Sequence, residues 1–300
     1  MSLGAFAGRG IRDLRNVTAL VTEGKKCRTV ENPNSTTDSS SSYAPDIFVD
    51  TVLDTDNGIG KYVEAVNVDT VSLTTAKAFC QNNNLPLQDG SNNLELFMDG
   101  IIADVGSWRE FWVNNAPFSL LELARKNGTD TLVPALPCNS SGRAAEDSGV
   151  PIEVPISALF TTGNILEDSY KEEFLNYGTA TEDIIASVIY REYNDKEIFS
   201  TKRSVDVNLK DTNVNTAIRE TFDLSQFVTQ REQAIMFGKL LCNQRRYIRK
   251  GIEFKTFPSE AAIEPGDFVF VDIGLENWDG YSTSIVMENG ELNTPLSVAP

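Results

Sequence analysis

The stretch from Arg219 to Ile273 constrains the fold most, because it places one long amphipathic helix between segments with the pattern of β-strands. Thr229 and Glu232 have the spacing of an N-terminal capping box, and Gly251 is the expected end of the helix. Apolar residues recur at intervals of three and four, which predicts a helix over 229–250 with one face on a core: Ala234, Phe237, Leu240, Leu241 and Ile248.

The segments after this helix alternate in the manner of strands. Residues 252–257 alternate with a period of two, as a half-buried strand does. Glu264-Pro265-Gly266-Asp267 places proline and glycine at the second and third positions of a type II turn, and residues 268–271 leave the turn as another strand. The predicted order is therefore strand, helix, strand, turn, strand.

Four pieces of this stretch also carry a resemblance, through their order and spacing: Glu220-Thr221-Phe222-Asp223-Leu224, Arg231-Glu232-Gln233-Ala234, Arg245-Arg246-Tyr247 and Glu264-Pro265-Gly266-Asp267-Phe268-Val269-Phe270-Val271. Together they resemble the central part of tail-tip attachment proteins of the protein J type, relatives of the baseplate hub proteins of long-tailed bacteriophages. The resemblance runs in order from about Val17 to about Leu292. The chain departs from longer members by lacking a full N-terminal domain and a receptor-binding C-terminal region.

The resemblance implies a structural part of the virion, made in the host bacterial cytoplasm. Such proteins are homotrimers at the distal end of the tail, where they join the tail tube to a spike or fibre and surround the path of DNA at ejection. The implied partners are further copies of the chain and the tail tube, tape-measure and spike or fibre proteins.

Composition excludes several classes of enzyme. The 300 residues contain no histidine, so the Ser-His-Asp and Cys-His arrangements are absent. The cysteines stand far apart, without a C-x-x-C pair, which indicates isolated thiols and no zinc site: Cys27, Cys80, Cys138 and Cys242. We therefore predict no catalytic residues, no cofactor, no metal and no enzymatic activity.

The charge is strongly negative but unevenly placed. The net charge is -17, while residues 201–250 hold ten Lys/Arg against five Asp/Glu, a local surplus of +5. Such an acidic balance argues against specific binding of nucleic acid and suits a ring that repels passing DNA. The basic stretch is then expected at subunit contacts or on the outside. No apolar run reaches the roughly 20 residues of a membrane span.

The predicted fold class is α+β, with several domains in which mixed or antiparallel sheets each pack one or two helices. The last domain is the beginning of a β-barrel-like unit, which we expect to be truncated. The predicted divisions are a hairpin and Ser/Thr-rich linker (1–45), an α+β hub domain (46–137), a linker (138–155), a second α+β hub domain with helix 229–250 (156–258), and the barrel start (259–300).

In the first half of the chain, the patterns predict helices over 44–53, 70–84 and 103–114, a strand over 93–100, and hairpins over 17–30 and around Asn127-Gly128. The acidic run 54–58 invites a calcium site, but the glycine stands one place too early for an EF-hand, so a solvated turn is expected. In the second half we predict a central strand over 183–193 and neighbouring strands over 198–207 and 218–224.

Two other functions remain open at this point. A receptor- or glycan-binding module of a tail would favour exposed aromatic residues around Trp278 and Tyr281. A tail-associated hydrolase would need carboxylates on both sides of a substrate. Neighbouring pairs such as Glu172 with Glu173, or Glu146 with Asp147, cannot be so placed within one extended segment.

Overall fold

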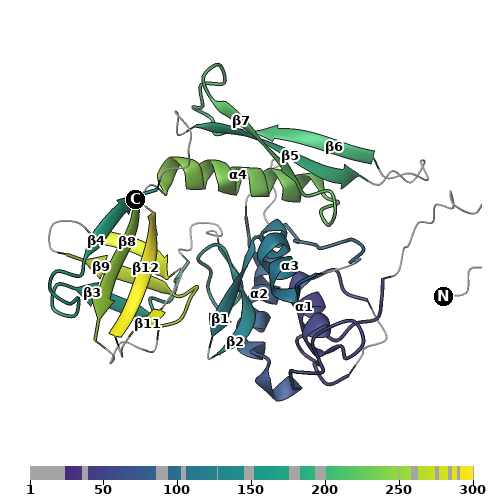
Figure 1. Cartoon of the computed structure of the whole chain (residues 1–300). Helices are drawn as coiled ribbons and strands as arrows, with labels where there is room; N and C mark the ends of the chain where they lie inside the picture. Colours follow the sequence, from purple (N-terminus) through teal and green to yellow (C-terminus); the bar gives the residue numbers. More distant parts are fainter. Residues whose placement is uncertain are drawn as a thin grey trace, which may run out of the picture.

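The chain forms three parts, which Figure 1 shows as a helical unit with a small hairpin, a three-stranded sheet over one long helix, and a larger curved sheet. This mixture of helices and sheets is the predicted α+β class. The computed structural model describes residues 24–35, 40–85, 94–102, 106–126, 128–144, 152–175, 183–192, 201–248, 250–257, 263–273, 277–282, 286–288 and 291–299, the last three by their backbone only. Among the helices in these ranges, none has the length and apolar character of a bilayer span.

The first part packs helices against a two-stranded hairpin. Its helix 44–53 has the predicted bounds, and the helix predicted over 70–84 ends two residues earlier. The hairpin turns at Gly128, whose φ of 80° is the left-handed conformation that glycine favours. The elements are α1 (Ala44–Leu53), η2 (Ala65–Asn67), α2 (Thr70–Asn82), α3 (Trp108–Asn115), η3 (Ala116–Ser119), β1 (Leu121–Lys126) and β2 (Thr129–Pro134).

Aromatic residues of α1 and α3 form the centre of this part. Phe48 is fully buried, and its ring centroid lies 5.2 Å from that of Trp108 and 5.1 Å from that of Trp112. Both indole N–H groups donate to Thr51 Oγ1, each at 3.2 Å. One hydroxyl therefore satisfies both indole donors and fixes α3 on α1.

Two predictions for this part are wrong. Residues 94–99 alternate between buried and exposed but pair with no strand, because their amides donate singly to Cys80 O, Ser42 O and Phe227 O. The helix predicted from Ala103 begins at Trp108, where the Ser107 side chain caps it by accepting from Glu110 N. Of the predicted N-terminal hairpin, residues 27–30 show one bridge among the described residues, from Thr29 to Asn32, and the first arm, 17–21, lies outside the described residues.

The second part is a sheet in the order β6-β5-β7. The central strand β5 (Ile184–Glu192) pairs antiparallel with β6 (Thr201–Val207) and parallel with β7 (Ile218–Asp223). Residues 184–188 of β5 are all buried, which confirms the predicted central strand. The strands predicted over 198–207 and 218–224 are confirmed with slightly shorter bounds.

Ion pairs cover the face of this sheet that α4 does not cover. Arg219 Nη1 of β7 lies 2.5 Å from Asp206 Oδ2 of β6, and Lys202 Nζ of β6 lies 2.9 Å from Asp223 Oδ2 of β7. Each pair joins the two edge strands, so it passes over the central strand β5. Ile185 of β5 lies on this face next to Arg219, and the ion-paired side chains shield it from water, so it is only 8% exposed.

The helix α4 (Arg231–Tyr247) lies between the sheet and the first part (Figure 1). Six consecutive residues, 233–238, are buried, so α4 is buried around its whole circumference there and not along one stripe as predicted. Phe237 packs against Phe222 of β7 at 6.1 Å and against Phe118 of the first part at 6.3 Å between ring centroids. At Gly238 an added Cβ would lie 2.8 Å from the side chain of Val207, so glycine permits the close approach of the sheet.

Both predicted ends of this helix are wrong. Thr229 does not cap it, because its hydroxyl donates to Asp99 Oδ2 at 3.2 Å, and the N-cap is Gln230. The helix ends at Tyr247, four residues before Gly251, because the chain must already be extended there to enter the next strand. Gly251 belongs to that strand and pairs with Glu173 on one side and Ser297 on the other.

The third part is a curved sheet in the order β3-β9-β10-β12-β8-β4, with β11 paired to β12. Two of its strands come before β5 in the sequence and the others follow α4, so the predicted boundary at residue 258 does not separate two sheets. No ladder among the described residues joins the end strands β3 and β4; only an isolated bridge links Ile165, after β3, to Thr256 of β8, so the sheet is not a closed barrel. The strands are β3 (Ala158–Thr161), β4 (Lys171–Phe174), β8 (Lys250–Thr256), β9 (Phe268–Asp272), β10 (Asn277–Ser282), β11 (Val286–Glu288) and β12 (Glu291–Ala299).

The predicted turn at 264–267 joins this sheet to the first part. Asp267 N donates to Glu264 O at 3.1 Å, and Gly266 has a φ of 91°, as the type II turn requires. The turn rests on β2, since a Cβ at Gly266 would lie 2.9 Å from Val133 Cγ2. Lys126 Nζ of β1 binds Asp267 Oδ1 at 3.0 Å. The turn is therefore a contact between two parts of the fold as well as a reversal of the chain.

Gln233 connects α4 to two other segments. Its side chain is fully buried; Oε1 accepts from Phe97 N at 3.1 Å, and Nε2 donates to Phe97 O at 2.9 Å and Phe118 O at 2.8 Å. All these groups would lose a partner if the amide were replaced by an apolar group of similar size, which costs about 1–3 kcal/mol for each buried group left unsatisfied.

We therefore expect Gln233→Met to lower the free energy of unfolding by about 2–4 kcal/mol, measured by urea denaturation. Gln230→Met is the matched control, because Gln230 makes no side-chain cap bond at the start of the same helix. It should change the free energy by less than about 0.5 kcal/mol. Equal stability of the two variants would contradict the role assigned to Gln233.

Candidate functional site

Three carboxylates lie in a row on one side of α1. Asp46, Asp50 and Asp54 stand four residues apart, and their side chains are 2%, 7% and 13% exposed. Asp50 and Asp54 lie near the C-terminal end of the helix, where the helix dipole disfavours negative charge. Carboxylates so buried and so placed need cations or hydrogen-bond donors close by. We call these three residues the acidic row.

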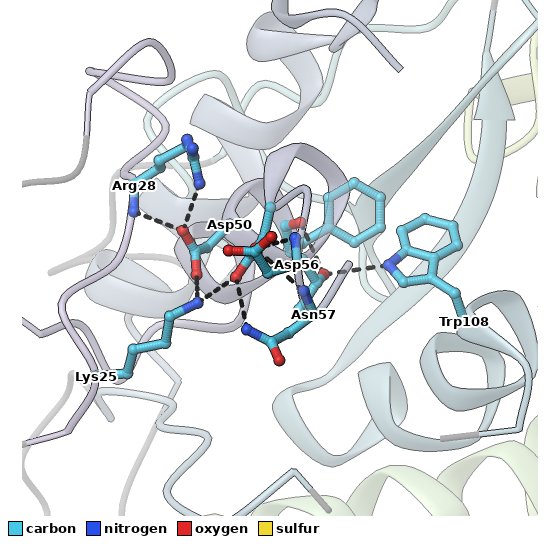
Figure 2. Close-up of polar contacts among 9 residues, drawn as sticks. Lys25, Arg28, Asp50, Asp56, Asn57 and Trp108 are labelled. Atoms are coloured by element: carbon cyan, nitrogen blue, oxygen red, sulfur yellow. Dashed lines mark hydrogen bonds and ion pairs between the residues drawn. The ribbon is translucent and has the colours of Figure 1, made fainter. Parts of the chain in front are cut away.

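The segment 24–31, which we call the strap, provides many of those donors (Figure 2). Lys25 Nζ lies 2.8 Å from Asp50 Oδ2 and 2.5 Å from Asp54 Oδ2. Arg28 donates twice to Asp50 Oδ1, from its backbone N at 3.2 Å and from Nη1 at 3.0 Å. A planar guanidinium and a backbone amide on the same oxygen make a directed contact.

The other end of the acidic row includes α2. Asp46 accepts from Val30 N at 2.9 Å and from Ser41 Oγ at 2.7 Å, and its Oδ2 lies 3.0 Å from Lys77 Nζ. Lys77 also binds Glu31 at 2.7 Å. The strap thus runs antiparallel to α1, from Lys25 beside Asp54 to Val30 beside Asp46, and two of its own residues, Cys27 and Val30, are buried.

The pairing shifts the proton equilibria of both partners. The hydrogen bond from Lys25 holds the pKa of Asp54 well below its usual range, against the effect of burial and with help from the amides of Asp56 and Asn57. Burial alone would lower the pKa of Lys25, but its hydrogen bonds to Asp50 and Asp54 outweigh this and raise the pKa. The ion pair therefore stays charged across neutral pH.

The acidic row attaches the strap to the helices. Each carboxylate of the acidic row accepts from a cation, and each also accepts from at least one backbone amide. Among the described residues, no group of three or more Cys, Asp or Glu side chains is placed to hold a metal ion. What the geometry supports is a fixed position for the strap against α1 and α2.

The predicted turn at 54–58 is confirmed. Asp54 Oδ1 accepts from Asp56 N at 2.8 Å and from Asn57 N at 3.1 Å, while Asp56 and Asn57 are exposed. The glycines after it allow the chain to pass close to the end of α1, since a Cβ at Gly58 would lie 2.0 Å from Thr51 O. Glycine is required at these positions because the chain passes so close to the helix backbone.

The four cysteines are free thiols, as predicted. Cys27, Cys80 and Cys242 are buried, and Cys138 is partly exposed. Burial raises the pKa of Cys138 to about 11 and that of Cys80 further. All four thiols are therefore protonated near neutral pH, which makes them weak nucleophiles.

The remaining candidates are only partly described. Glu172 accepts from Tyr170, which lowers the pKa of its carboxyl, and pairs with Lys250 at 3.3 Å. Glu146 and Asp147 lie outside the described residues, and so do the side chains of Trp278 and Tyr281.

Much of the basic surplus at 201–250 forms ion pairs within the chain, while several of its cations remain on the outside: Lys202, Arg203, Arg219 and Arg231 are 51–59% exposed. Arg245 binds Glu220 at 2.9 Å and Arg246 binds Asp183 at 2.7 Å, so these two arginines fasten the end of α4 to the sheet. Five further cations of the stretch form ion pairs as well: Lys202, Arg203, Arg219, Arg231 and Lys250.

Sequence reasoning missed the acidic row and the strap. A signal was present, since Asp46, Asp50 and Asp54 recur every four residues and Lys25 and Arg28 precede them.

No protein-family model matches the chain, and no curated protein matches it at a significant level. A chain from the virion of the native gene transfer agent (GTA) particle is 15% identical with a TM-score of 0.39, over 55% of this chain and 35% of that one. The tail protein from Neisseria meningitidis MC58 is 11% identical with a TM-score of 0.39, over 72% and 60%. The 43 kDa tail protein of prophage MuSo2 from Shewanella oneidensis is 13% identical with a TM-score of 0.35, over 61% and 52%. The chain thus spans 35% to 60% of the length of these structures, and similarity at this level assigns no role to a residue.

Removal of one carboxylate should loosen the strap. In a Cys138→Ser background, Asp50→Asn should make Cys27 react at least about ten times faster with a thiol reagent, because Arg28 and Lys25 lose their shared charged acceptor. Asp56→Asn removes the same charge from the exposed turn next to the row and should leave the rate unchanged. Equal rates in all three proteins would show that the strap does not depend on Asp50.

The stability of the chain should also depend on pH through Asp54. Because the folded-state pKa is depressed, the stabilisation is present above the unfolded value of about 3.9 and is lost as pH falls below it. Wild-type protein should therefore lose free energy of unfolding below about pH 4, and Asp54→Asn should be less stable at pH 7 and show a shallower acid loss. Parallel pH profiles for the two proteins would contradict this assignment.

Proposed function

We propose that the chain is a structural component of a phage tail, at the tip or baseplate hub, where it joins the tail tube to a spike or fibre. The proposal rests on the position of the residues that carry the resemblance. Glu220, Gln233, Arg245 and Asp267 all belong to the four resembling pieces, and each makes a contact that holds parts of the fold together. Residues with such contacts stabilise the fold, which is a structural role and not a catalytic one.

The path of the chain through its two sheets supports a mechanical role. The chain enters the curved sheet with β3 and β4, leaves to form the second sheet and α4, and returns with β8. The second sheet is thus anchored at both ends in the curved sheet, and α4 shares one buried cluster with the first part. A tail component transmits force between its neighbours, and parts anchored in this way resist separation.

The charge supports a place around the DNA path. Seven of the ten cations in 201–250 form ion pairs within the chain, and the net charge of -17 means a surplus of 17 carboxylates over cations. In a closed homotrimer, like surfaces face one axis. Carboxylates at that axis would repel DNA and let it pass without specific binding. The proposal places the protein in the virion, after synthesis in the host bacterial cytoplasm, with the tail tube, tape-measure and spike or fibre proteins as partners and no enzymatic step.

Size-exclusion chromatography with light scattering tests the proposal on the 300-residue chain. We expect a species of about three times the 33.0 kDa chain mass, with no retardation of duplex DNA in a gel at about 0.15 M salt. A monomer at every concentration, or tight binding of DNA, would contradict the proposed role.

A further inference from the structure

We propose that β4 of one copy pairs edge to edge with β6 of a second copy of this chain. The inference rests on the proposed function, since it names the surfaces through which copies would join in a ring. It follows from the position, the exposure and the charge of these two strands.

The strand β4 is the last strand at one end of the curved sheet. It pairs with β8 on one side and with no other described strand on the other, so one row of its backbone N–H and C=O groups points away from the sheet. All four of its residues are exposed. Phe174 is 76% exposed, and Lys250 Nζ lies above its ring, at 5.7 Å from the centroid. An exposed aromatic side chain beside a free edge is the kind of anchor that interfaces bury.

The strand β6 is an end strand of the second sheet. It pairs with β5 alone among the described strands, and residues 201–204 are exposed. Lys202 and Arg203 are 59% and 57% exposed even though each pairs with a carboxylate of its own chain. Cations this exposed can form a second ion pair with a carboxylate of a neighbouring molecule while they keep the first ion pair.

The charges of the two strands select a pairing between unlike edges. Pairing β4 with β4, in the antiparallel register that opposes Glu172 and Glu173, places carboxylates together, and pairing β6 with β6 in the same way places cations together. In an antiparallel pairing of β4 with β6, Glu172 lies opposite Arg203 and Glu173 opposite Lys202. Opposite charges on facing residues stabilise a strand pair, and like charges destabilise it.

The placement of the two edges fits a ring. Figure 1 shows β4 in the curved sheet and β6 at the far end of the second sheet, on opposite sides of the chain. A contact between two different surfaces of identical copies is heterologous, and it closes into a ring when the rotation between copies allows it. Backbone pairing of this kind is the way in which extended segments are recognised at free sheet edges.

Charge exchange tests the inference by light scattering of the whole chain. We expect E172K/E173K and K202E/R203E each to raise the concentration for half-assembly at least tenfold, and the variant with all four changes to return toward the wild-type value. D56K/E64K makes the same charge change as E172K/E173K, at exposed residues away from both strands, and should assemble as wild type does. Circular dichroism confirms that each variant is folded.

Cross-linking provides a measurement that does not depend on charge reversal. In a Cys138→Ser background, Glu173→Cys combined with Lys202→Cys should form covalent dimers and trimers on mild oxidation, and either cysteine alone should not. A wild-type trimer that persists in both double variants and does not cross-link would overturn this inference while the proposed function stands. A wild-type monomer under all conditions would overturn both.

Discussion

The burial of α4 from two sides is the contact on which the rest of the structure depends. A surface helix buries one stripe, but residues 233–238 of α4 are buried all round because a sheet lies on one side and the helical first part on the other. Phe237 contacts aromatic rings of both. Because the same helix completes both cores, neither can separate without exposing α4 to water.

Polar contacts give this packing one fixed arrangement. Gln233 bonds to backbone groups of two segments of the first part, and Arg245 and Arg246 bind the second sheet at the other end of the helix. Apolar packing alone tolerates sliding, whereas buried hydrogen bonds fail when the register changes. The strap adds a similar ionic contact on the far side of α1. The fold is therefore held by directed contacts at each of its junctions.

Local patterns in the sequence predicted the elements well and their connections less well. The helix 44–53, the strand pairing around β5 and the turn at Gly266 follow from periodicity and turn chemistry, which act over a few residues. The curved sheet depends on the pairing of β4 with β8 and of β3 with β9, whose segments lie about 80 and about 110 residues apart, and no local pattern encodes such pairing. Thr229 shows the same limit, because a distant partner, Asp99, takes the hydroxyl that the capping box would use.

The same limit applies to the candidate site. The spacing of Asp46, Asp50 and Asp54 is visible in the sequence, but their burial depends on the path of the strap. The basic stretch suggested an outer surface, which fits its exposed residues, but Arg245 and Arg246 hold α4 to its sheet through acidic partners such as Asp183, which lie far away in the sequence. A map of the purified assembly by electron cryo-microscopy tests the central claim most directly. The account predicts three copies around a channel lined by carboxylates, with α4 buried in each copy; isolated copies, or a channel lined by arginine and lysine, would contradict it.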